Sequence, residues 1–540
     1  MAAGLMRASA VMASGTMVSR ILGLAKAMLL AIAIGSVGST SADAFQNGNL
    51  LPNIVYMILL GGMLNAVLVP QIVKAAHNPD GGAAYINKIL TLITVALVAI
   101  TAIAMLCAPW IVRLTAVTWP DDQLALATAF AYWCLPQIVF YGLYTVLGEV
   151  LNARSVFGPF TWAPVLNNVI AIAGIVVFML MYGADPTGQL RSVVDWDALA
   201  IAVLAGSATL GVVAQGLILF VSWRRAGIRY RPDFVWRGVG LGRTAKIAVW
   251  SLATIVVMNL GGLITNNVVA IGSGAGPSTS AMGNVWLIFM MPHSVIAVSL
   301  ATAYFTRLSE WGQTGRMAEF REDFSASARQ ISLVMMFAAV ALFAAAPFVA
   351  RIINIRATEL QVDQFALALQ AYVLSLAAYS FLFVVQRSFY ALSDTRTPFL
   401  FTSVQMGLVI VFSLLLPSFV PAEFIGMAYA LVWSLATIVQ AVLATLLLRR
   451  KIGSIDGLRI TQSVVRFVLA AVPAALLGMV VTGLIRGAAG QVNAVVAVLC
   501  AVVVALVCGV VYLICLRLMR SPELAELTGF VARKLGRTRS

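Results

Sequence analysis

Apolar runs of about 20 residues recur along the whole chain of 540 residues, and they restrict the fold more than any other feature. A helix of that length crosses a hydrocarbon core of about 30 Å and satisfies its own backbone hydrogen bonds inside it. The chain is 61% hydrophobic and only 10% charged, which excludes an ordinary soluble domain. The sequence therefore predicts an all-α polytopic membrane protein.

We expect fourteen transmembrane helices, and the first apolar run carries Arg20 and Lys26, so we do not expect it to be cleaved as a signal peptide. The predicted spans lie near residues 8–35, 44–73, 89–112, 123–149, 159–182, 198–222, 245–272, 281–306, 330–350, 364–386, 398–420, 424–448, 467–485 and 492–516.

The net charge of +15 is distributed unevenly between alternate loops. Of the 35 Lys and Arg residues, 28 fall on the side of the termini, five on the opposite side and two within the first span. By the positive-inside rule, we expect both termini to lie in the cytoplasm. The expected location is the plasma (inner) membrane of a bacterium. The pattern argues against nucleic acid as a partner, and the two His and five Cys residues are too scattered to predict a metal site.

An internal repeat divides the chain. Pro159 and Pro398 follow similar links, 239 residues apart, and the first and seventh spans end in Ala-Ile-Gly, 237 residues apart. An even number of spans per copy gives two parallel six-helix repeats, an architecture of transporters, with two C-terminal helices outside them. The predicted parts are an N-terminal lobe (1–222), a cytoplasmic linker (223–244), a C-terminal lobe (245–448), a last helix pair (467–516) and a basic amphipathic tail (517–540).

Two cations in the middle of the first span are the leading candidates for a functional site. A charge at that depth costs several kcal/mol, so Arg20 and Lys26 predict either a wet cavity or an anionic partner. Six residues separate them, which is about 9 Å along a helix and roughly 120° around it. Arg20 suits bidentate binding of a phosphate and Lys26 suits a point charge. The alternative is a structural pairing with Asp43 or with carbonyl groups.

Three further sets of residues are candidates for functional roles. Asp43, at the start of the second span, fits either a gate that pairs with a cavity cation or a simple helix cap. A hinge or a kink is predicted where glycine and proline interrupt that span, at Pro52, Gly61 and Gly62. A network of ions at the inner surface is predicted from Arg387, Asp394 and Arg396.

Several motifs in order resemble the MurJ (MviN) family of lipid II flippases, in the multidrug/oligosaccharidyl-lipid/polysaccharide exporter superfamily. The resemblance covers nearly the whole chain, and we expect an actinobacterial member. The motifs are Ser19-Arg20-Ile21-Leu22-Gly23, Ala42-Asp43-Ala44-Phe45, Leu51-Pro52-Asn53 with Gly61-Gly62 and Val69-Pro70, Ala163-Pro164-Val165-Leu166-Asn167-Asn168, and Phe389-Tyr390-Ala391 with Asp394-Thr395-Arg396-Thr397-Pro398.

The resemblance implies two six-helix lobes, a last helix pair that forms a groove for the lipid tail, and export of undecaprenyl-diphosphate-linked peptidoglycan precursor. It implies that Arg20, Lys26 and Asn53 bind substrate, that Asp43 is functional, and, by counting back from Pro292, that Ser280 lines the cavity. Two positions depart from the family, because Tyr56 and Leu287 stand where it has cations. Some actinobacterial relatives carry a kinase-like extension, which we expect to be absent or removed, since the sequence stops at Ser540.

These features favour a flippase that works by alternating access, without a cofactor and driven by the membrane potential, with any coupling ion left open. The sequence has no P-loop motif for ATP. Its expected partners are lipid II, membrane lipids, and cell-wall synthesis or division proteins. The alternatives are an exporter of another polyprenyl-diphosphate-linked oligosaccharide, a drug exporter, a cell-wall scaffold without transport, and an enzyme that uses the acidic residues Asp121, Asp122, Asp185, Asp195 and Asp197. Cavity cations disfavour the drug exporter.

Overall fold

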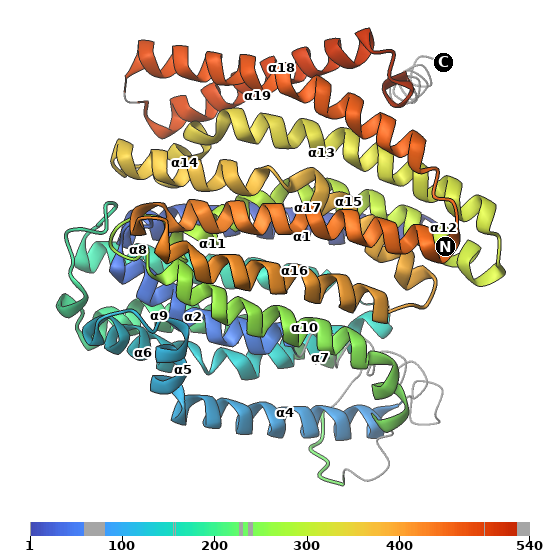
Figure 1. The fold of residues 1–540 in the computed structure, drawn as a ribbon. Helices are drawn as coiled ribbons and strands as arrows, with labels where there is room; N and C mark the ends of the chain where they lie inside the picture. Colours follow the sequence, from blue (N-terminus) through green and yellow to red (C-terminus); the bar gives the residue numbers. More distant parts are fainter. Residues whose placement is uncertain are drawn as a thin grey trace. The chain divides into compact units, whose positions relative to one another are not determined.

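The computed structural model describes residues 2–58, 82–154, 156, 158–225, 230–235, 241–490 and 492–525. All the regular structure in these ranges is helical, and they contain no strand. Figure 1 shows these helices, with colours that follow the sequence. The prediction of an all-α protein is confirmed.

The chain divides into two compact units, residues 1–280 and 281–540. The helices that lie within the first unit are α1 (Ala2–Ile34), α2 (Thr40–Ile58), α4 (Ala83–Leu106), α5 (Ala108–Thr115), α6 (Asp121–Cys134), α7 (Gln137–Ala153), α8 (Gly158–Tyr182), η2 (Val193–Asp195), α9 (Ala198–Arg225) and α10 (Leu241–Ala270). The boundary falls near the start of α11 (Thr279–Pro292).

The second unit continues from α11 with a π-helical turn, η3 (His293–Ala297). The remaining helices are α12 (Val298–Thr314), α13 (Met317–Ile353), α14 (Glu359–Val373), α15 (Leu376–Ala391), α16 (Arg396–Leu415), η4 (Leu416–Ser418), η5 (Ala422–Phe424), α17 (Ile425–Ile452), α18 (Gly457–Ala489) and α19 (Ala494–Leu518).

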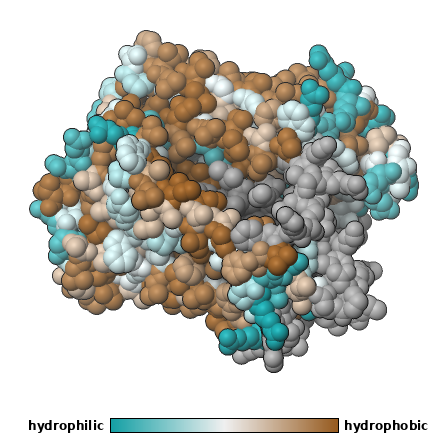
Figure 2. Space-filling view, turned by 90° about the horizontal axis from the view of Figure 1, so that it is seen from below, coloured by the Kyte–Doolittle hydropathy of each residue, from teal (hydrophilic) through white to brown (hydrophobic). Residues whose placement is uncertain are grey.

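Among the described residues, 13 helical segments are long and apolar enough to cross a membrane. The second predicted span begins with α2, and the rest of it, including Gly61 and Gly62, lies outside the described residues. Hydrophobic side chains cover much of the surface seen in Figure 2. This apolar exterior is the one expected of a chain that hydrocarbon, rather than water, surrounds.

The internal repeat is visible in where equivalent helices begin. Helices α2 and α11 begin at Thr40 and Thr279, which are 239 residues apart, the offset that the two proline links predict. Helices α8 and α16, which follow those links, begin at Gly158 and Arg396. The two copies therefore keep the same order of elements.

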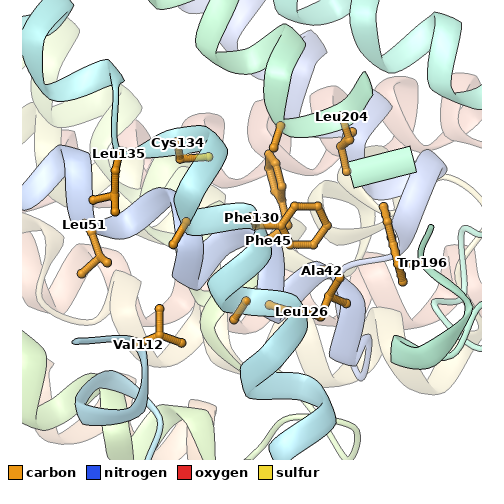
Figure 3. Packing of buried hydrophobic residues seen from close by; sticks show 14 of the residues in the cluster. Ala42, Phe45, Leu51, Val112, Leu126, Phe130, Cys134, Leu135, Trp196 and Leu204 are labelled. Atoms are coloured by element: carbon orange, nitrogen blue, oxygen red, sulfur yellow. The ribbon is translucent and has the colours of Figure 1, made fainter. Parts of the chain in front are cut away.

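The core of the first unit forms where α2 meets α6 and the segment before α9 (Figure 3). The ring of Phe130 makes edge contacts with Phe45 and with Trp196, at centroid distances of 5.3 and 5.1 Å. Gly48 permits this approach, because a Cβ atom there would lie 2.9 Å from the carbonyl oxygen of Ala127. The core thereby holds the start of α2, which carries Asp43, against α6.

In the second unit, α13 packs against both α18 and α19. Phe348, Phe467 and Val504 are buried in this three-helix core. The hydroxyl of Tyr512 donates to the carbonyl oxygen of Leu333 at 3.1 Å, so α19 is also tied to the backbone of α13.

An ion pair closes the inner end of these three helices, the end predicted to face the cytoplasm. Arg329 of α13 and Glu523, just after α19, lie 2.8 Å apart, and both side chains are buried. Glu523 also accepts hydrogen bonds from Ser463 of α18 at 2.7 Å and from Ser521 at 2.8 Å. Three helices therefore meet at one carboxylate.

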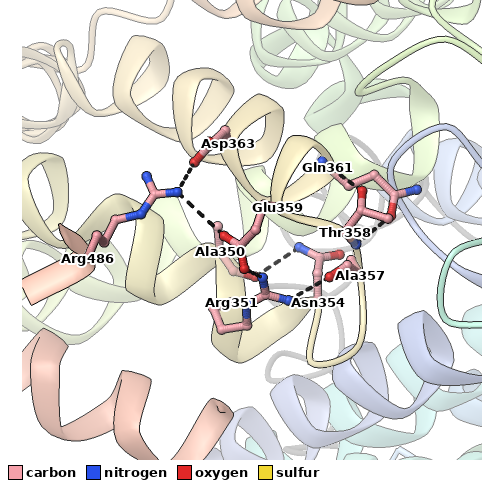
Figure 4. A network of polar contacts seen from close by, with 9 residues as sticks. All are labelled: Ala350, Arg351, Asn354, Ala357, Thr358, Glu359, Gln361, Asp363 and Arg486. Carbon is pink, nitrogen blue, oxygen red and sulfur yellow. Dashed lines mark hydrogen bonds and ion pairs between the residues drawn. The ribbon is translucent and has the colours of Figure 1, made fainter. Parts of the chain in front are cut away.

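A second ionic cluster closes the opposite, outer end (Figure 4). Arg486 of α18 pairs with Asp363 at 2.8 Å and with Glu359 at 3.5 Å, both on α14. Glu359 also pairs with Arg351, near the end of α13. The guanidinium of Arg351 in turn donates to the carbonyl oxygen of Ala357 at 2.6 Å. Helix α18 is thus fastened near one end by the hydrogen bond of Ser463 to Glu523 and near the other end by the ion pairs of Arg486.

We predict that Glu523→Gln lowers the free energy of unfolding by about 3 kcal/mol at neutral pH, because Arg329 stays buried without its carboxylate. Burial by itself would raise the pKa of Glu523, but the hydrogen bonds from Ser463, Arg329 and Ser521 outweigh it and lower that pKa from 4.5 to about 2. A lowered pKa stabilises the folded state above the ordinary value and loses this effect as the pH falls towards 2. In thermal unfolding in detergent, the difference in melting temperature between wild type and Glu523→Gln should therefore begin to shrink as the pH falls below about 4.5.

The matched control is Glu319→Gln, which removes the carboxylate from the exposed pair that Glu319 forms with Arg316. It should change thermal unfolding little, because water screens such a pair. Equal melting temperatures for wild type and Glu523→Gln at neutral pH would contradict the role given to this carboxylate.

Candidate functional site

Helix α1 brings the two predicted cations into a candidate membrane span, Ser14–Ile34. It packs against α8, where the side-chain amide of Asn168 donates to the carbonyl oxygen of Ser19 at 2.9 Å and contacts the Ser19 hydroxyl at 3.3 Å. Arg20 follows this anchor directly. The position of its Cα is therefore set by a hydrogen bond between helices, of the kind that small polar residues make within membranes.

Arg20 and Lys26 are both partly exposed. Within the described part of the chain, no carboxylate lies within the 4.0 Å ion-pair limit of Lys26. An ammonium group at membrane depth without a carboxylate suits an anion that arrives from outside the protein.

Asp43 is buried in the first turn of α2, where its carboxylate accepts hydrogen bonds from the turn after α10 and from the first turn of α11. Oδ2 accepts from the hydroxyl of Ser273 at 2.7 Å, and Oδ1 accepts from the backbone N–H of Ser280 at 2.8 Å. The structure thus brings together two residues predicted separately, Asp43 and Ser280. No Lys or Arg of the described ranges forms an ion pair with Asp43.

Further hydrogen bonds hold this contact in place. The side-chain amide of Gln123 donates to the hydroxyl of Ser273 at 2.9 Å and to the carbonyl oxygen of Thr40 at 3.2 Å. The backbone N–H of Gly38 donates to the carbonyl oxygen of Gly276 at 3.1 Å. The turn after α1 and the turn after α10 are therefore joined through α6.

The outer end of α10 is also tied to the segment that follows α5. Asn266 and Asn267 donate to the carbonyl oxygens of Thr115 and Leu114 at 2.9 and 2.6 Å, and Trp119 donates to that of Ala270 at 2.9 Å. These asparagines satisfy backbone carbonyl groups that the short helix α5 leaves without a partner at its end.

An outer cap, formed by the loop 183–197 between α8 and α9, is a feature that the sequence reasoning missed. Asp185 is buried, and its carboxylate accepts the backbone N–H groups of Gln189, Leu190 and Arg191 at 3.0 to 3.1 Å. Its own N–H donates to the carbonyl oxygen of Ala33 at the end of α1 at 3.1 Å. The cap is thereby fastened to the turn that leads into α2.

Arg191 completes the outer cap by stacking on aromatic rings. Its guanidinium carbon lies 5.0, 5.4 and 5.8 Å from the ring centroids of Phe178, Trp196 and Tyr182. Trp196 in turn donates to the hydroxyl of Ser41 on α2 at 2.9 Å. Only the aromatic and glycine residues in this loop could have signalled the cap in the sequence.

Three of the five acidic residues considered for an enzyme, Asp185, Asp195 and Asp197, accept hydrogen bonds from the backbone. Asp195 accepts from the backbone N–H of Ser192 at 2.8 Å, and Asp197 accepts from that of Ala200 at the start of α9 at 2.7 Å. Asp121 lies in the first turn of α6. Among the described residues, no group of three or more His, Cys, Asp or Glu side chains could hold a metal ion.

Three predicted or departing positions of the second span, Pro52, Asn53 and Tyr56, lie on α2. Helix α2 continues through Pro52, and the side-chain amide of Asn53 donates to the carbonyl oxygen of Asn49 one turn earlier at 2.9 Å. Tyr56, at a position where the family resemblance implies a cation, contacts the ring of Tyr141 of α7 in a tilted arrangement at a centroid distance of 4.8 Å. The predicted hinge glycines, Gly61 and Gly62, lie outside the described residues.

Asp394 and Arg387, two of the three residues of the predicted inner-surface network, have different partners. Asp394 pairs with Lys451 at 2.5 Å and accepts from the backbone N–H of Thr397 at 3.0 Å, which caps the start of α16. Arg387 instead stacks on Phe305 and Phe383, with centroid distances of 5.1 and 4.9 Å. Arg396 begins α16.

A helical bundle with intramembrane cations and a repeated order of spans defines a polytopic membrane transporter rather than an enzyme. Solved structures agree on the fold. The chain resembles a structure titled lipid II flippase MurJ, inward closed conformation, with a TM-score of 0.69 and 17% identity over 93% of this chain and 98% of that one. It also resembles an inward-facing multidrug resistance transporter of the MATE family, with a TM-score of 0.62 and 16% identity over 83% and 98% of the two chains.

The family follows from the sequence comparison. The family model described as lipid II flippase MurJ matches residues 31–518, so the chain belongs to that family. The lipid II flippase MurJ of Burkholderia cenocepacia is 28% identical over 77% of this chain and 78% of the relative. A probable lipid II flippase MurJ of Vibrio cholerae is 24% identical over 89% of this chain and 88% of the relative.

We predict that Gly188→Ala destabilises the outer cap. Gly188 has a φ of +68°, and a Cβ atom there would lie 2.2 Å from that of Ser39. The left-handed backbone costs about 1 kcal/mol for alanine, and the overlap adds about 1 to 3 kcal/mol. Thermal unfolding measures the sum. Gly183→Ala is the control, since its φ of +78° is similar but nothing lies within 4 Å of the new atom. Equal effects of the two substitutions would contradict the close packing.

We also predict that Asp43→Ala releases the 271–280 segment. The substitution leaves the N–H of Ser280 and the hydroxyl of Ser273 without their acceptor, which costs about 1 to 3 kcal/mol for each buried donor. Hydrogen exchange of peptides covering 271–280 should become faster. Asp122→Ala, at an exposed carboxylate on α6, should leave that exchange unchanged. Unchanged exchange in Asp43→Ala would show that other contacts hold the segment.

Proposed function

We propose that this chain moves lipid II, the lipid-linked peptidoglycan precursor, from the inner to the outer leaflet of the bacterial plasma membrane. Membership of the MurJ family supports this activity. The named relatives are described as lipid II flippases, certain or probable. The proposed work is transport of a lipid without any covalent chemistry.

The observation that carries the proposal is the pair of cations on α1. The diphosphate of the substrate is the part of a lipid-linked precursor that most resists entry into hydrocarbon, since it is charged. Arg20 would bind it through two parallel hydrogen bonds, and Lys26 would stabilise it as a point charge. Asn53 and Ser280 are proposed to contribute polar contacts. Asp43 is proposed to act as a gate whose release from Ser273 and Ser280 frees the turn after α10.

Transport is proposed to occur by alternating access of two lobes, residues 1–222 and 245–448, with Pro52, Gly61 and Gly62 as the hinge. The two termini are proposed to face the cytoplasm, as the distribution of Lys and Arg indicates. Two negative charges that leave an inside-negative cell gain about 4 to 5 kcal/mol per 100 mV. That free energy is sufficient to bias the cycle without ATP. Cell-wall synthesis or division proteins are proposed partners.

We predict that Arg20→Ala abolishes lipid II export, because the diphosphate loses its bidentate partner. Arg20→Lys should retain a smaller activity, since a lysine keeps the charge without the fork of donors. The measurement is the accessibility of lipid II to an outside reagent in cells depleted of this protein and complemented with each variant.

Lys26→Arg is the matched control on the same helix and should export normally, because it keeps the charge. Normal export by a well-expressed Arg20→Ala protein would remove that residue from the mechanism. Intact export in cells that lack the whole protein would instead favour a scaffold. If another polyprenyl-diphosphate-linked oligosaccharide accumulated inside while lipid II did not, the cargo would be wrong although the transport mechanism would stand.

A further inference from the structure

The surface of the second unit has an open apolar groove that the proposed transport does not use. Its volume is about 490 Å³, and it is lined by residues of α13, α15, α17 and α18 and by Leu374, which follows α14. None of its lining residues comes from α19. The groove therefore differs from one between the last two helices, which the family resemblance implies. Val442, Leu446 and Val465 line it and are about half exposed.

The length of the groove along α17 fits within one leaflet of a bilayer. On α17 the lining runs from Ile438 to Leu446, which is about 12 Å of helix. That length is somewhat less than half of a hydrocarbon core of about 30 Å. Its inner end is marked by the hydroxyl-bearing residues Thr445 and Thr461, near the turn between α17 and α18.

Two arginines extend the groove beyond that inner end. Arg449 and Arg450 follow Thr445 and Leu446 by four residues, and residues four apart share a face of a helix. Both arginines are exposed, and within the described ranges neither forms an ion pair. The neighbouring Lys451, in contrast, is paired with Asp394. Positive charge is therefore available at the mouth of the groove.

We propose that this groove binds an anionic phospholipid of the inner leaflet. One of its acyl chains lies along Val442, Leu446 and Val465, and its phosphate meets Arg449 and Arg450. Basic residues beside an apolar groove on the cytoplasmic side recognise anionic head groups in this way. A zwitterionic lipid fits the same apolar surface but gains less from the arginines. The assignment to the inner leaflet rests on the proposed orientation, whereas the binding does not depend on transport.

The test is photo-crosslinking of the full chain in nanodiscs of phosphatidylcholine that contain a trace of phosphatidylglycerol with a diazirine on one acyl chain. Mass spectrometry should locate the label on groove residues of α17 and α18. Unlabelled phosphatidylglycerol should compete, and added phosphatidylcholine should not. Labelling should fall about fivefold for each arginine removed in Arg449→Gln and Arg450→Gln, because each is worth about one cation at an anionic lipid surface.

Matched variants separate the groove from the general surface. Arg459→Gln is the charge control, because Arg459 lies about 160° around α18 from Thr461. Val465→Trp should fill the groove and abolish labelling there, whereas Val503→Trp, at an exposed position of α19, should not.

Three outcomes would overturn the proposal. Equal loss in Arg459→Gln and Arg449→Gln would mean that diffuse positive charge, and not this site, recruits the lipid. Equal competition by phosphatidylcholine would reduce the groove to an unspecific contact with the bilayer. Displacement of the label by undecaprenyl diphosphate, but not by phosphatidylglycerol, would assign the groove to the transported lipid instead. Export is also measured for a variant that combines Arg449→Gln with Arg450→Gln. Loss of lipid labelling with normal export supports the groove as a site separate from the α1 cations and leaves the proposed function intact.

Discussion

Hydrocarbon offers no hydrogen-bond partner, so each polar group of this chain must find one within the protein or from its substrate. The described part of the molecule meets this requirement by gathering its carboxylates at the ends of helices. Asp43 takes donors from the turn after α10, Asp185 takes the backbone N–H groups of its own loop, and Glu523 takes Arg329 and two hydroxyls. The connections between these helix ends follow from a few acceptors.

This use of the acidic residues shapes the chemistry of the candidate site. The carboxylates of the outer end are occupied by hydroxyl and N–H donors, and among the described residues none of them pairs with Lys26. No carboxylate of that part of the chain therefore cancels the charge of Lys26. A carrier of cations would need the reverse arrangement, with acidic groups directed towards its cargo. The same sorting occurs at the mouth of the groove, where Asp394 pairs with Lys451, and within the described ranges Arg449 and Arg450 have no carboxylate partner.

Much of the fold could be predicted because length and hydropathy are local properties of the sequence. Apolar runs predicted the spans, and Pro159 and Pro398 predicted the offset at which α2 and α11 begin. Asp43 and Ser280 could each be singled out, but their contact could not, since it joins positions 237 residues apart through a backbone N–H that any residue would supply. The outer cap escaped prediction for the same reason, because Asp185 binds main-chain groups and leaves no pattern of side chains. Arg387 was expected among ions and lies on aromatic rings, which attract a guanidinium without any carboxylate.

The two ionic clusters of α18 have a mechanical consequence. A helix fastened at one end can swing about that end, but α18 is held to α13 through Glu523 at one end and to α14 through Arg486 at the other. Helix α19 is also joined to α13, by the hydrogen bond from the hydroxyl of Tyr512 to the carbonyl oxygen of Leu333. The last two helices are therefore held rigidly against the rest of the second unit. We therefore expect α13, α18 and α19 to keep their arrangement in any conformational change of the second unit.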